Sequence, residues 1–567
     1  MAKGFSTAAA DIQSAVFEYS RSPDQDAATP PRHPVIVVGA GPVGLAVAID
    51  LAQSGVPVVL LDEDDALSNG SRAICFAKRS LEIFDRLGCG QGIVDKGIVW
   101  RTGKVFFRDQ PVYSFDLQPE AGYKRPAFVN LQQYYVEAHL LERAIRLDNL
   151  DIRWKSRVTR VVQHSDHVRL AVETPEGIYE VEADWVAACD GGRSTTRQLL
   201  GLESKGRVFK DRFLIADIKM EAEFPTERWF WFDPPFHPGQ SVLLHKQPDD
   251  VWRVDFQLGW DADPVAERDP ARVIPRVKAL LGDDTPFSLE WVSVYTFVCM
   301  RMDRFRHGRV LFAGDAAHGV SPFGARGANS GIQDAENLAW KLRLVINGKA
   351  PEALLDSYDS ERVLAADENI LHSTRSTDFI TPKNQASRDF RNAALDLSRR
   401  HGFARRLVNS GRLSVPAVLT GSPLNTGDTE PFDAAAAPGA VAPDAPVEIA
   451  GRDAWLLDRL GGRFTILVFA GADDTVRLPT GADIAAIGRD VEAVATVLVA
   501  PDAAAAARLA SAGADAVVDA AGLVAKRYDA RPGTTYLLRP DQHVCARFRA
   551  FAPDRLRAAL LHATANG

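Results

Sequence analysis

The feature that most constrains this chain is a glycine-rich turn between an apolar run and a helical run. Residues 35–38 are predicted to form a buried strand, Gly39-Ala-Gly41-Pro-Val-Gly44 follows it, and residues 45–51 begin a helix. The first glycine permits a tight turn, the second lets the backbone approach a pyrophosphate, and the third lets the helix pack against the strand. The helix N-terminus then presents free N–H groups and a positive dipole end to phosphate groups.

A second apolar run completes a βαβ unit. Residues 58–61 are predicted to form its second strand, which ends at Asp62. An acidic residue at this point can accept hydrogen bonds from the ribose hydroxyls of an adenosine. Strand, helix and acidic residue together predict a dinucleotide site rather than a simple glycine turn, but the motif does not separate FAD from NAD.

Composition indicates a multidomain protein with reduced cysteines. With 567 residues the chain exceeds one compact domain, and its net charge of -8 argues weakly against nucleic acid as a partner. Its five cysteines stand singly, with no CxxC pair and no metal-ligand spacing to histidine, so we expect no metal site and a cytoplasmic location. No signal peptide is visible, and the most apolar run, residues 35–49, is too short to span a membrane.

Two further segments narrow the choice of dinucleotide. Residues 188–197 contain Asp190 in Ala-Cys-Asp-Gly-Gly-Arg-Ser, and residues 308–318 contain Asp315 in Phe-Ala-Gly-Asp-Ala-Ala-His, followed by a glycine-rich stretch. Alone, the first would be an ordinary turn and the second a helix cap. In this order after the first motif, they closely resemble the class A flavoprotein aromatic hydroxylases, which include p-hydroxybenzoate, phenol and 3-(3-hydroxyphenyl)propionate hydroxylases. The resemblance covers about residues 34–375.

The resemblance implies a set of contacts to a non-covalent FAD. Arg72 matches an arginine that reaches the pyrophosphate and ribose, and Gln133, with Gln132 as the alternative, matches a glutamine near the ribityl chain. Asp190 resembles the aspartate that serves the flavin and nicotinamide sites, and Asp315 resembles the one that binds the ribityl hydroxyls. The expected cofactor-binding residues are Gly39, Gly41, Gly44, Asp62, Arg72, Gln133, Val158 (by its backbone, to adenine), Asp190, Gly314, Asp315, Gly327, Ala328 and Asn329.

The glycine-rich stretch also has a physical rationale of its own. The helix after residues 324–331 begins with N–H groups that can stabilise negative charge, and reduced flavin carries that charge at N1–C2=O. The resemblance implies that Pro322 lies at the reacting edge of the flavin ring. Arg326 departs from the family, since many relatives have Gln or Glu before Gly-Met-Asn here. Its side chain either alters the charge or mobility of the flavin, or faces solvent.

The region between the second and third motifs is predicted to cover the flavin with a sheet. Along residues 252–260, apolar side chains alternate with polar ones, which is typical of a strand with one face in a core. The polar face lines either solvent or the substrate pocket. By resemblance, Arg253 is a candidate for holding a substrate carboxylate, and His245 or Tyr295 for contacting a phenolic oxygen. With Pro322, these three form the candidate catalytic set; the alternative for each is an outward-facing side chain.

Two other functions stay open. Trp229-Phe-Trp231-Phe-Asp233-Pro partly resembles a W-x-W-x-I-P segment of flavin-dependent halogenases, but an aspartate stands where isoleucine belongs, and paired tryptophans are more often core residues. A flavin-binding scaffold without turnover is the other alternative. The sequence argues against a metal hydrolase and against a serine hydrolase, because neither H-E-x-x-H nor G-x-S-x-G occurs in it.

The fold class expected is α/β, with a Rossmann-type FAD-binding domain, an inserted mixed-sheet substrate domain and a C-terminal thioredoxin-like α/β domain. The last resembles the C-terminal domain of the phenol hydroxylase branch, although its redox cysteine pair is missing here, which excludes thiol chemistry. The expected boundaries are an N-terminal extension at 1–33, the FAD-binding domain at 34–205 and 300–380, the substrate domain at 206–299, a helical segment and linker at 381–440, and the thioredoxin-like domain at 441–567.

The function that the resemblance implies is aromatic hydroxylation. NADH or NADPH reduces FAD, O2 adds to give a C4a-hydroperoxyflavin, and oxygen passes to a phenolic substrate. The flavin carries this chemistry, while the protein positions the ring and excludes water. Family members are expected to be homodimers, and we expect no nucleic acid or membrane partner.

Overall fold

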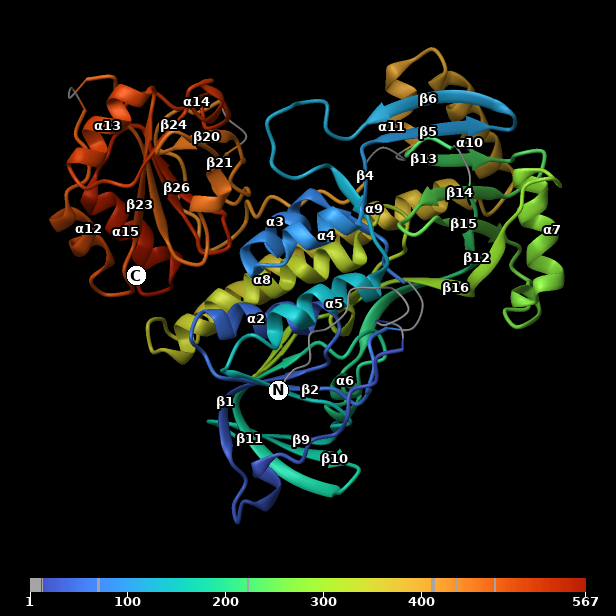
Figure 1. Cartoon of the computed structure of the whole chain (residues 1–567), viewed down its shortest axis with the longest axis horizontal. Helices are drawn as coiled ribbons and strands as arrows, with labels where there is room; N and C mark the ends of the chain where they lie inside the picture. The colour runs from blue at the N-terminus through green and yellow to red at the C-terminus, as the bar shows by residue number, and fades with distance from the viewer. Residues whose placement is uncertain are drawn as a thin grey trace.

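The computed structural model describes residue 12 and residues 14–68, 72–221, 224–408, 413–433, 436–473 and 476–567. It contains three parts, which Figure 1 shows as a nucleotide-binding α/β unit, a second large sheet to one side, and a compact C-terminal domain on the other. The long helices α8 (Gly327–Ile346) and α9 (Leu354–Ile380) run between these parts.

The first sheet has a parallel centre in the order β17-β18-β11-β1-β2-β8. The predicted strand–helix–strand unit is confirmed as β1, α2 and β2, and β1 pairs in parallel with both β2 and β11. The two central strands β1 and β2 contain the buried apolar runs 35–38 and 58–61, as expected at the covered centre of a parallel sheet. The elements are β1 (Arg32–Val38), α2 (Pro42–Gln53), β2 (Val58–Leu61), α5 (Gln133–Ala144), β8 (Leu150–Arg153), β9 (Arg157–Gln163), β10 (Val168–Thr174), β11 (Gly177–Ala188), α6 (Thr195–Leu199), β17 (Arg306–His307) and β18 (Val310–Phe312).

The second sheet is mostly antiparallel, in the order β19-β16-β12-β15-β14-β13-β5-β6. It includes β5 and β6, so the insertion at 206–299 is extended by strands from a segment that the sequence assigned to the FAD-binding domain. Its strands are β5 (Thr102–Phe107), β6 (Gln110–Asp116), β12 (Ser204–Lys219), β13 (Arg228–Phe232), β14 (Ser241–Lys246), β15 (Val251–Leu258), β16 (Ser288–Met302) and β19 (His318–Gly319).

One face of the second sheet is an apolar core beneath helix α7 (Pro270–Leu281). The predicted alternation along β15 is observed, because Trp252, Val254 and Phe256 are buried together with Val273 and Val277 of α7. The polar residues of β15 consequently face the other way, toward the nucleotide-binding unit. This places the polar face in the interior of the molecule rather than in solvent.

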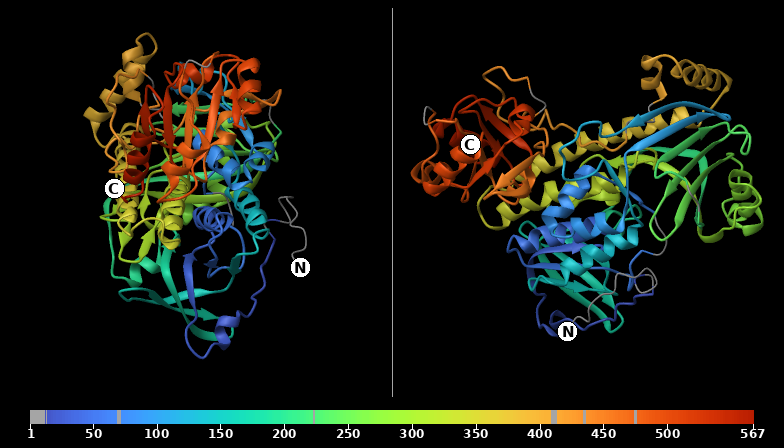
Figure 2. Two further views of the ribbon diagram at one scale, coloured as in Figure 1. Left: turned by 90° about the vertical axis from the view of Figure 1, so that its left-hand side faces the viewer. Right: turned by 45° about the horizontal axis from the view of Figure 1, so that its top comes forward.

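Smaller elements connect the two sheets. They are β3 (Cys75–Ala77), α3 (Lys78–Leu87), α4 (Gly90–Lys96), β4 (Ile98–Trp100) and β7 (Phe128–Asn130), of which β3, β7 and β4 form a three-stranded sheet. After α9, the chain continues through α10 (Gln385–Ser398) and α11 (Gly402–Val408), which lie beside β6 (Figure 2).

The C-terminal domain has a seven-stranded sheet in the order β21-β20-β24-β23-β22-β25-β26. The central β22 pairs in parallel with β23 and antiparallel with β25, which agrees with the α/β class predicted for this domain. The elements are β20 (Pro446–Ile449), β21 (Arg452–Trp455), β22 (Thr465–Phe469), α12 (Gly481–Gly488), β23 (Ala495–Ala500), α13 (Ala503–Ser511), β24 (Ala516–Val518), α14 (Leu523–Arg527), β25 (Thr535–Leu538), β26 (Val544–Phe548) and α15 (Pro553–Ala563).

The N-terminal segment before β1 packs on the nucleotide-binding unit where it is described. Phe17 stacks on Trp154 with ring centroids 4.3 Å apart, and Asp24 forms an ion pair with the buried Arg153 at 2.7 Å. Asp24 lies in a 3-10 turn, η1 (Pro23–Asp26), which precedes β1. The described part of the predicted extension is therefore attached to the domain that follows it.

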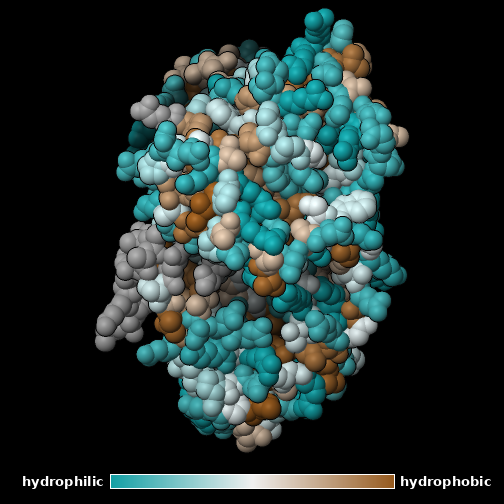
Figure 3. Space-filling model, turned by 90° about the vertical axis from the view of Figure 1, so that its right-hand side faces the viewer, coloured by the Kyte–Doolittle hydropathy of each residue, from teal (hydrophilic) through white to brown (hydrophobic). Residues whose placement is uncertain are grey.

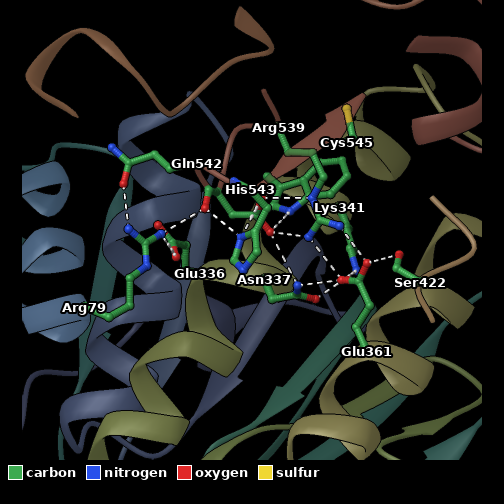
Figure 4. Close-up of polar contacts among 12 residues, drawn as sticks. Arg79, Glu336, Asn337, Lys341, Glu361, Ser422, Arg539, Gln542, His543 and Cys545 are labelled. Atoms are coloured by element: carbon green, nitrogen blue, oxygen red, sulfur yellow. Dashed lines mark hydrogen bonds and ion pairs between the residues drawn. The ribbon is translucent and has the colours of Figure 1, made fainter. Parts of the chain in front are cut away.

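A buried network of charges joins the C-terminal domain to the nucleotide-binding helices (Figure 4). Arg539 donates to both carboxylate oxygens of Glu361 on α9, at 2.6 and 3.1 Å, and to Asp541. Lys341 of α8 donates to Glu361 at 2.7 Å. These four side chains are almost fully buried, so each charge depends on its partners.

The same network extends to α3. Arg79 donates to Glu336 of α8 at 2.6 Å, to Gln542 at 2.8 Å and to the backbone oxygen of Asp541 at 2.9 Å. A turn of the C-terminal domain at 539–543 thus contacts α3, α8 and α9 together. The domain is held by specific polar contacts as well as by the apolar packing of Trp340 against Phe464.

The outer surface is mostly hydrophilic on the side of α7. Figure 3 shows its hydrophobic residues as separate small patches, which is usual for a protein surface. Within the described ranges, no helix is long and apolar enough to cross a membrane.

We predict that Glu361→Gln destabilises the protein by about 3–5 kcal/mol, because it leaves Arg539 and Lys341 as buried cations without a full counter-charge. Although burial alone would raise the pKa of Glu361, these two cations hold it well below its usual range. The stabilisation is therefore present at neutral pH and is lost only as strong acid protonates the carboxylate. The midpoint of urea unfolding measures the effect.

Glu352→Gln is the matched control. Glu352 pairs with Arg309 at 2.7 Å, but its side chain is half exposed, so its loss should cost at most about 1 kcal/mol. Equal unfolding midpoints for the two variants would contradict a structural role for the buried network.

Candidate functional site

The first glycine motif forms a close-packed turn that opens on one side. A Cβ atom at Gly44 would lie 1.8 Å from the carbonyl oxygen of Gly39, and one at Gly39 would lie 2.6 Å from that of Cys189. A Cβ atom at Gly41 would meet nothing within 4 Å. Gly41 is also the N-cap of α2, and no side chain caps this helix among the described residues. The turn therefore offers backbone N–H groups and open space, as a pyrophosphate requires.

The second and third motifs meet this turn. Val43 packs against Gly314 and Gly331, where Cβ atoms would come within 2.9 and 2.7 Å of its methyl group. A Cβ atom at Gly192 would lie 4.0 Å from the Cβ atom of Asp315. Three segments that are distant in sequence thus meet beside the open space at Gly41, which we call the hollow. The required closeness explains why glycine occurs at the contact positions.

Asp62 ties the glycine turn to the end of β2. Its carboxylate accepts hydrogen bonds from the backbone N–H groups of Ala40 and Asp64, the latter at 2.8 Å. Burial nevertheless raises the pKa of Asp62 to about 6, because these two bonds only partly offset its desolvation. A carboxylate that is so poorly solvated is stabilised by further hydrogen-bond donors, such as ribose hydroxyls.

Asp315 and Asp190 differ in how their carboxylates are used. Asp190 accepts from the Ser194 hydroxyl at 2.6 Å and from the backbone N–H of Thr196 at 2.8 Å, so it orders the loop before α6. The Asp315 carboxylate makes no hydrogen bond to any residue in the described ranges. Its side chain is solvent-accessible, yet desolvation by the surrounding protein raises its pKa. Such a group lies on the wall of a hollow and can still accept hydrogen bonds from a ligand.

The start of α8 is fixed by Asn329. Its side-chain oxygen accepts from the backbone N–H of Ala77 at 2.8 Å and from Ser80 at 2.7 Å, while its nitrogen donates to the backbone oxygen of Cys75 at 2.8 Å. Gly327 and Ala328 are the first two residues of α8 and are half-buried. Asn329 therefore locks the N-terminus of α8 against the junction of β3 and α3.

A buried aspartate supports the third motif from behind. Asp334 of α8 accepts from the backbone N–H of Gly314 at 3.0 Å and contacts His318 at 2.7 Å and Arg362 at 2.6 Å. Burial alone would raise the pKa of Asp334, but the charges of His318 and Arg362 hold it at about 2. The loop that carries Asp315 is consequently anchored by a permanently ionised carboxylate.

Arg326 is buried, so the solvent-facing alternative for it is wrong. Its side chain is 2% exposed and donates to the backbone oxygen of Phe323 at 3.1 Å. The guanidinium lies over Gly324, where a Cβ atom would come within 1.6 Å of Nη1. Pro322, in the same loop, is exposed. The loop before α8 thus carries a positive charge beside an exposed proline.

The other predicted cofactor residues lie along the same side. The Oε1 atom of Gln133 accepts from the backbone N–H of Ala73 at 3.1 Å, next to the exposed Arg72. Gln132 points elsewhere, since its Nε2 atom donates to Pro248 at 3.3 Å. Val158 is buried at the start of β9. Of the two glutamines, Gln133 is therefore the one beside the Arg72 segment.

Strands β14, β15 and β16 bring the candidate catalytic residues to one face. Arg253 donates to both oxygens of Asp217 at 2.8 Å, and to the backbone oxygen of Arg72 at 3.3 Å. His245 lies opposite Arg253 across the strand pair, with its Nδ1 atom 3.9 Å from the Cys75 sulfur. Arg253 is thus fixed by an internal ion pair.

Charge around this face sets the protonation of its residues. Burial, together with the positive charges of Arg228 and Arg253, holds the pKa of His245 well below 6.5, so the imidazole is neutral. Desolvation raises the pKa of Tyr295, partly offset by Arg72 and Arg253. His245, Arg253 and Tyr295 therefore share one electrostatic environment with the Arg72 segment, while Pro322 lies on the loop before α8.

Sequence reasoning missed Arg228, Asp217 and Asp255 on this face. Burial raises the pKa of Asp255 to about 6, and Arg228 is 8% exposed at the start of β13. The signal available for Arg228 was a single charge at the start of the aromatic run Arg228–Phe232. The alternation along β15 placed Asp255 on the polar face, but it did not predict that this side chain is buried.

Trp229 and Trp231 have structural contacts. Both pack against Phe106, with ring centroids 5.5 and 5.2 Å away, and Trp231 is buried in the core under α7.

All five cysteines are buried free thiols. Among the residues that the structure describes, no cluster of histidine, cysteine, aspartate or glutamate could hold a metal ion.

Comparison with known proteins agrees with this geometry. A family model described as an FAD binding domain matches residues 32–373. The chain is 31% identical over 359 residues to a 3-(3-hydroxy-phenyl)propionate/3-hydroxycinnamic acid hydroxylase of Mycolicibacterium smegmatis, covering 62% of each chain. It is 33% identical over 362 residues to a 12-dehydrotetracycline 5-monooxygenase/anhydrotetracycline 6-monooxygenase of Streptomyces rimosus, covering 61% of this chain and 69% of that relative.

The fold is shared beyond the part that aligns by sequence. The flavin-dependent monooxygenase PieE, solved in complex with FAD and substrate, has a TM-score of 0.79 at 21% identity and covers 95% of this chain and 100% of its own. By sequence, the chain matches 62% of the length of the Mycolicibacterium relative. The predicted resemblance to FAD-dependent aromatic hydroxylases is confirmed.

We expect Asp315→Ala to weaken FAD binding by about ten- to a hundredfold, because a charged hydrogen bond to a ligand hydroxyl contributes about 1.5–3 kcal/mol. Titration of the apoprotein with FAD measures the dissociation constant. Asp303→Ala is the control, since Asp303 is an exposed aspartate paired with Lys205 outside the hollow. Unchanged FAD affinity in folded Asp315→Ala would show that Asp315 does not contact the cofactor.

Proposed function

Because the chain belongs to the FAD-binding domain family, we propose that it is a single-component flavoprotein monooxygenase that uses NAD(P)H and O2 to hydroxylate a phenolic aromatic compound. The observation that carries this proposal is the convergence of three sequence motifs on one hollow, beside the polar face of the second sheet. One side of the site suits a dinucleotide, and the other suits an aromatic ring with polar substituents.

The residues present fit FAD. The Gly39–Gly44 turn and the uncapped start of α2 suit the pyrophosphate, Asp62 suits the adenosine ribose, and Asp315 suits the ribityl chain. Asn329 and the first N–H groups of α8 suit the pyrimidine end of the ring system, where a helix N-terminus stabilises negative charge. Bound FAD supplies hydride acceptance and oxygen activation, which no side chain here can supply.

The polar face of the sheet is suited to a phenol. Burial and the positive charges of Arg228 and Arg253 keep His245 neutral, and the same positive potential would lower the pKa of a phenol bound beside them. A phenolate is the more electron-rich form of the ring and accepts oxygen more readily. We assign to His245 a hydrogen bond to this oxygen, to Arg253 its electrostatic stabilisation, and to Tyr295 and Pro322 the walls around the reacting ring.

The nicotinamide cosubstrate needs a route to the flavin that does not use the FAD-binding turn. Only one G-x-G-x-x-G turn occurs in the sequence, and FAD would occupy it. NADH or NADPH would then reach the flavin transiently from the surface, near Asp190. Homodimer formation and a cytoplasmic location remain predictions.

The halogenase alternative is weakened by Trp229 and Trp231, because both side chains pack among core aromatics on the side of α7. The relatives named above are hydroxylases and monooxygenases. A flavin-binding scaffold without turnover is the remaining alternative, and a turnover assay separates it from an enzyme.

The proposed function is tested by screening phenolic compounds for stimulated NAD(P)H oxidation by the FAD-loaded protein. The expected result is a yellow protein that consumes O2 and releases a product heavier than its substrate by one oxygen atom. A protein that binds FAD yet hydroxylates no compound would favour the scaffold. A colourless protein that cannot be reconstituted with FAD would refute the cofactor assignment itself.

We also predict that a bound phenol accelerates flavin reduction at least about tenfold. Reduction without substrate would waste NAD(P)H, and a transient nicotinamide site suits control by movement of the flavin. Gly324, which has a φ of 106°, allows a tight turn in the loop before α8, and Gly327 and Gly331 lie in the first two turns of that helix. Anaerobic stopped-flow measurement of the flavin reduction rate, with and without a hydroxylated substrate, tests this prediction. Equal rates would exclude gating and leave the flavin assignment intact.

A further inference from the structure

Three helices begin close to the hollow. Gly41 is the N-cap of α2, and α8 begins with Gly327, two residues before Asn329. Helix α3 begins beside α8, because the backbone N–H of Ala77 and the hydroxyl of Ser80 both donate to the side-chain oxygen of Asn329, at 2.8 and 2.7 Å. The first turn of α3 therefore holds the start of α8 in place.

A buried chain of ion pairs joins the same three helices. Arg86 of α3 donates to both carboxylate oxygens of Asp50 on α2, at 2.7 and 2.5 Å, and to Glu336 of α8 at 3.2 Å. Arg79, in the first turn of α3, donates to the other oxygen of Glu336 at 2.6 Å. These four side chains are at most 10% exposed. Since breaking one pair leaves a buried charge uncompensated, the helices keep their relative places.

The C-terminal domain joins this chain at Arg79 (Figure 4). The Nη1 atom of Arg79 donates to the side-chain oxygen of Gln542 at 2.8 Å, and its Nη2 atom donates to the backbone oxygen of Asp541 at 2.9 Å. Gln542 is fixed in turn, because its amide nitrogen donates to the backbone oxygens of Leu457 and Leu460, at 3.1 and 2.8 Å. A well-anchored turn of the C-terminal domain thus holds the guanidinium of Arg79.

Close packing leaves little room for this contact to shift. A Cβ atom at Gly461 of the C-terminal domain would lie 2.9 Å from the Cδ atom of Arg86 and 3.2 Å from the Cγ atom of Gln542. Both arginines of α3 therefore lie directly against this domain. Arg79 is adjacent in sequence to Ser80, so any displacement of Arg79 also moves the donors that fix the start of α8.

We propose that Arg79 is a positioning residue for the flavin, through which the C-terminal domain sets the reduction potential of bound FAD. Gln542 holds Arg79 in the first turn of α3, and the same turn carries Ser80, which fixes the start of α8. The N–H groups at that helix start suit the negative charge of reduced flavin, and their effect is confined to the first turn of the helix. A displaced α8 therefore stabilises reduced FAD less, while oxidised FAD is little affected. This inference rests on the proposed function for the cofactor but not for turnover.

The direct test is the midpoint potential of bound FAD, measured by anaerobic equilibration of the FAD-loaded full-length protein with a redox dye. Gln542→Asn shortens the side chain by one methylene, so that it no longer reaches Arg79. Asparagine tolerates the left-handed backbone at this position, where φ is 57°. We expect the variant to lose about fivefold of its preference for reduced over oxidised FAD. For a two-electron couple this corresponds to a potential about 20 mV more negative.

Arg79→Gln breaks the same contact from the other side. Its potential should shift in the same direction and by at least as much. Adding Gln542→Asn to this variant should shift the potential no further, because both changes remove one interaction. If Arg79→Gln does not retain FAD, the measurement on Gln542→Asn decides the inference, since that change lies in the C-terminal domain and leaves every buried charge in place.

Glu492→Gln is the matched control, because it breaks another contact between the same domain and the same helix. Arg343, in the last turn of α8, donates to both carboxylate oxygens of Glu492, at 2.7 and 3.1 Å. Its loss loosens the domain at the far end of α8, so it should lower the Tm and leave the potential unchanged. If Gln542 only attached the domain, Gln542→Asn would likewise lower the Tm at an unchanged potential.

The outcomes are distinct. An unchanged or more positive potential in Gln542→Asn overturns the inference, as does an equal shift in Glu492→Gln. Additive shifts of Arg79→Gln and Gln542→Asn overturn it as well. If a phenol is hydroxylated while the potentials of all variants agree, the inference fails and the proposed function stands. If the potentials shift as expected but no compound is hydroxylated, the inference stands and the proposed function fails, because the potential is measured without substrate.

Discussion

The site depends first on how closely three backbone segments approach one another around Val43. The turn from Gly39 to Gly44 presses against Cys189, and Gly314 and Gly331 lie against the side chain of Val43. Side chains at these glycines would collide with backbone or core atoms, so the contact forms only with glycine at each point. Because the three segments end in this contact, the groups that face a bound dinucleotide are held on rigid strands and helices.

A second layer of constraint lies behind the helices. Asp334 fixes the loop of the third motif, Asn329 fixes the start of α8, and Glu361 on α9 accepts from Arg539 of the C-terminal domain. These buried polar contacts are specific in geometry rather than strongly stabilising, since desolvation offsets much of their attraction. The C-terminal domain, which lacks a redox cysteine pair, therefore contacts α3, α8 and α9 from the side away from the glycine turn through these buried charges.

The sequence makes its most detailed prediction for the dinucleotide half of the site, because that half consists of local patterns. Glycine spacing, an acidic residue after a strand, and an apolar run are all visible within a few residues of each other, as for Gly39 and Asp62. For the substrate half, the sequence predicted only that one face of the sheet is polar. Whether Arg253 is free or paired depends on Asp217, which reaches it from another strand across the sheet. Such pairing depends on how strands from distant segments are aligned in the sheet, and no local sequence pattern determines that alignment.

The two arginines of the second sheet show why that difference matters for function. Arg253 has its counter-charge built in, and so it contributes a fixed positive potential whether or not a ligand is present. Arg228 is buried among aromatic rings; its Nη1 atom has no hydrogen-bond partner, and Asp255 acts on its charge without a hydrogen bond between the two side chains. The same field keeps His245 neutral. On our proposal, these side chains would set the charge and the hydrogen bonding around a bound aromatic ring, which are tasks that the flavin leaves to the protein.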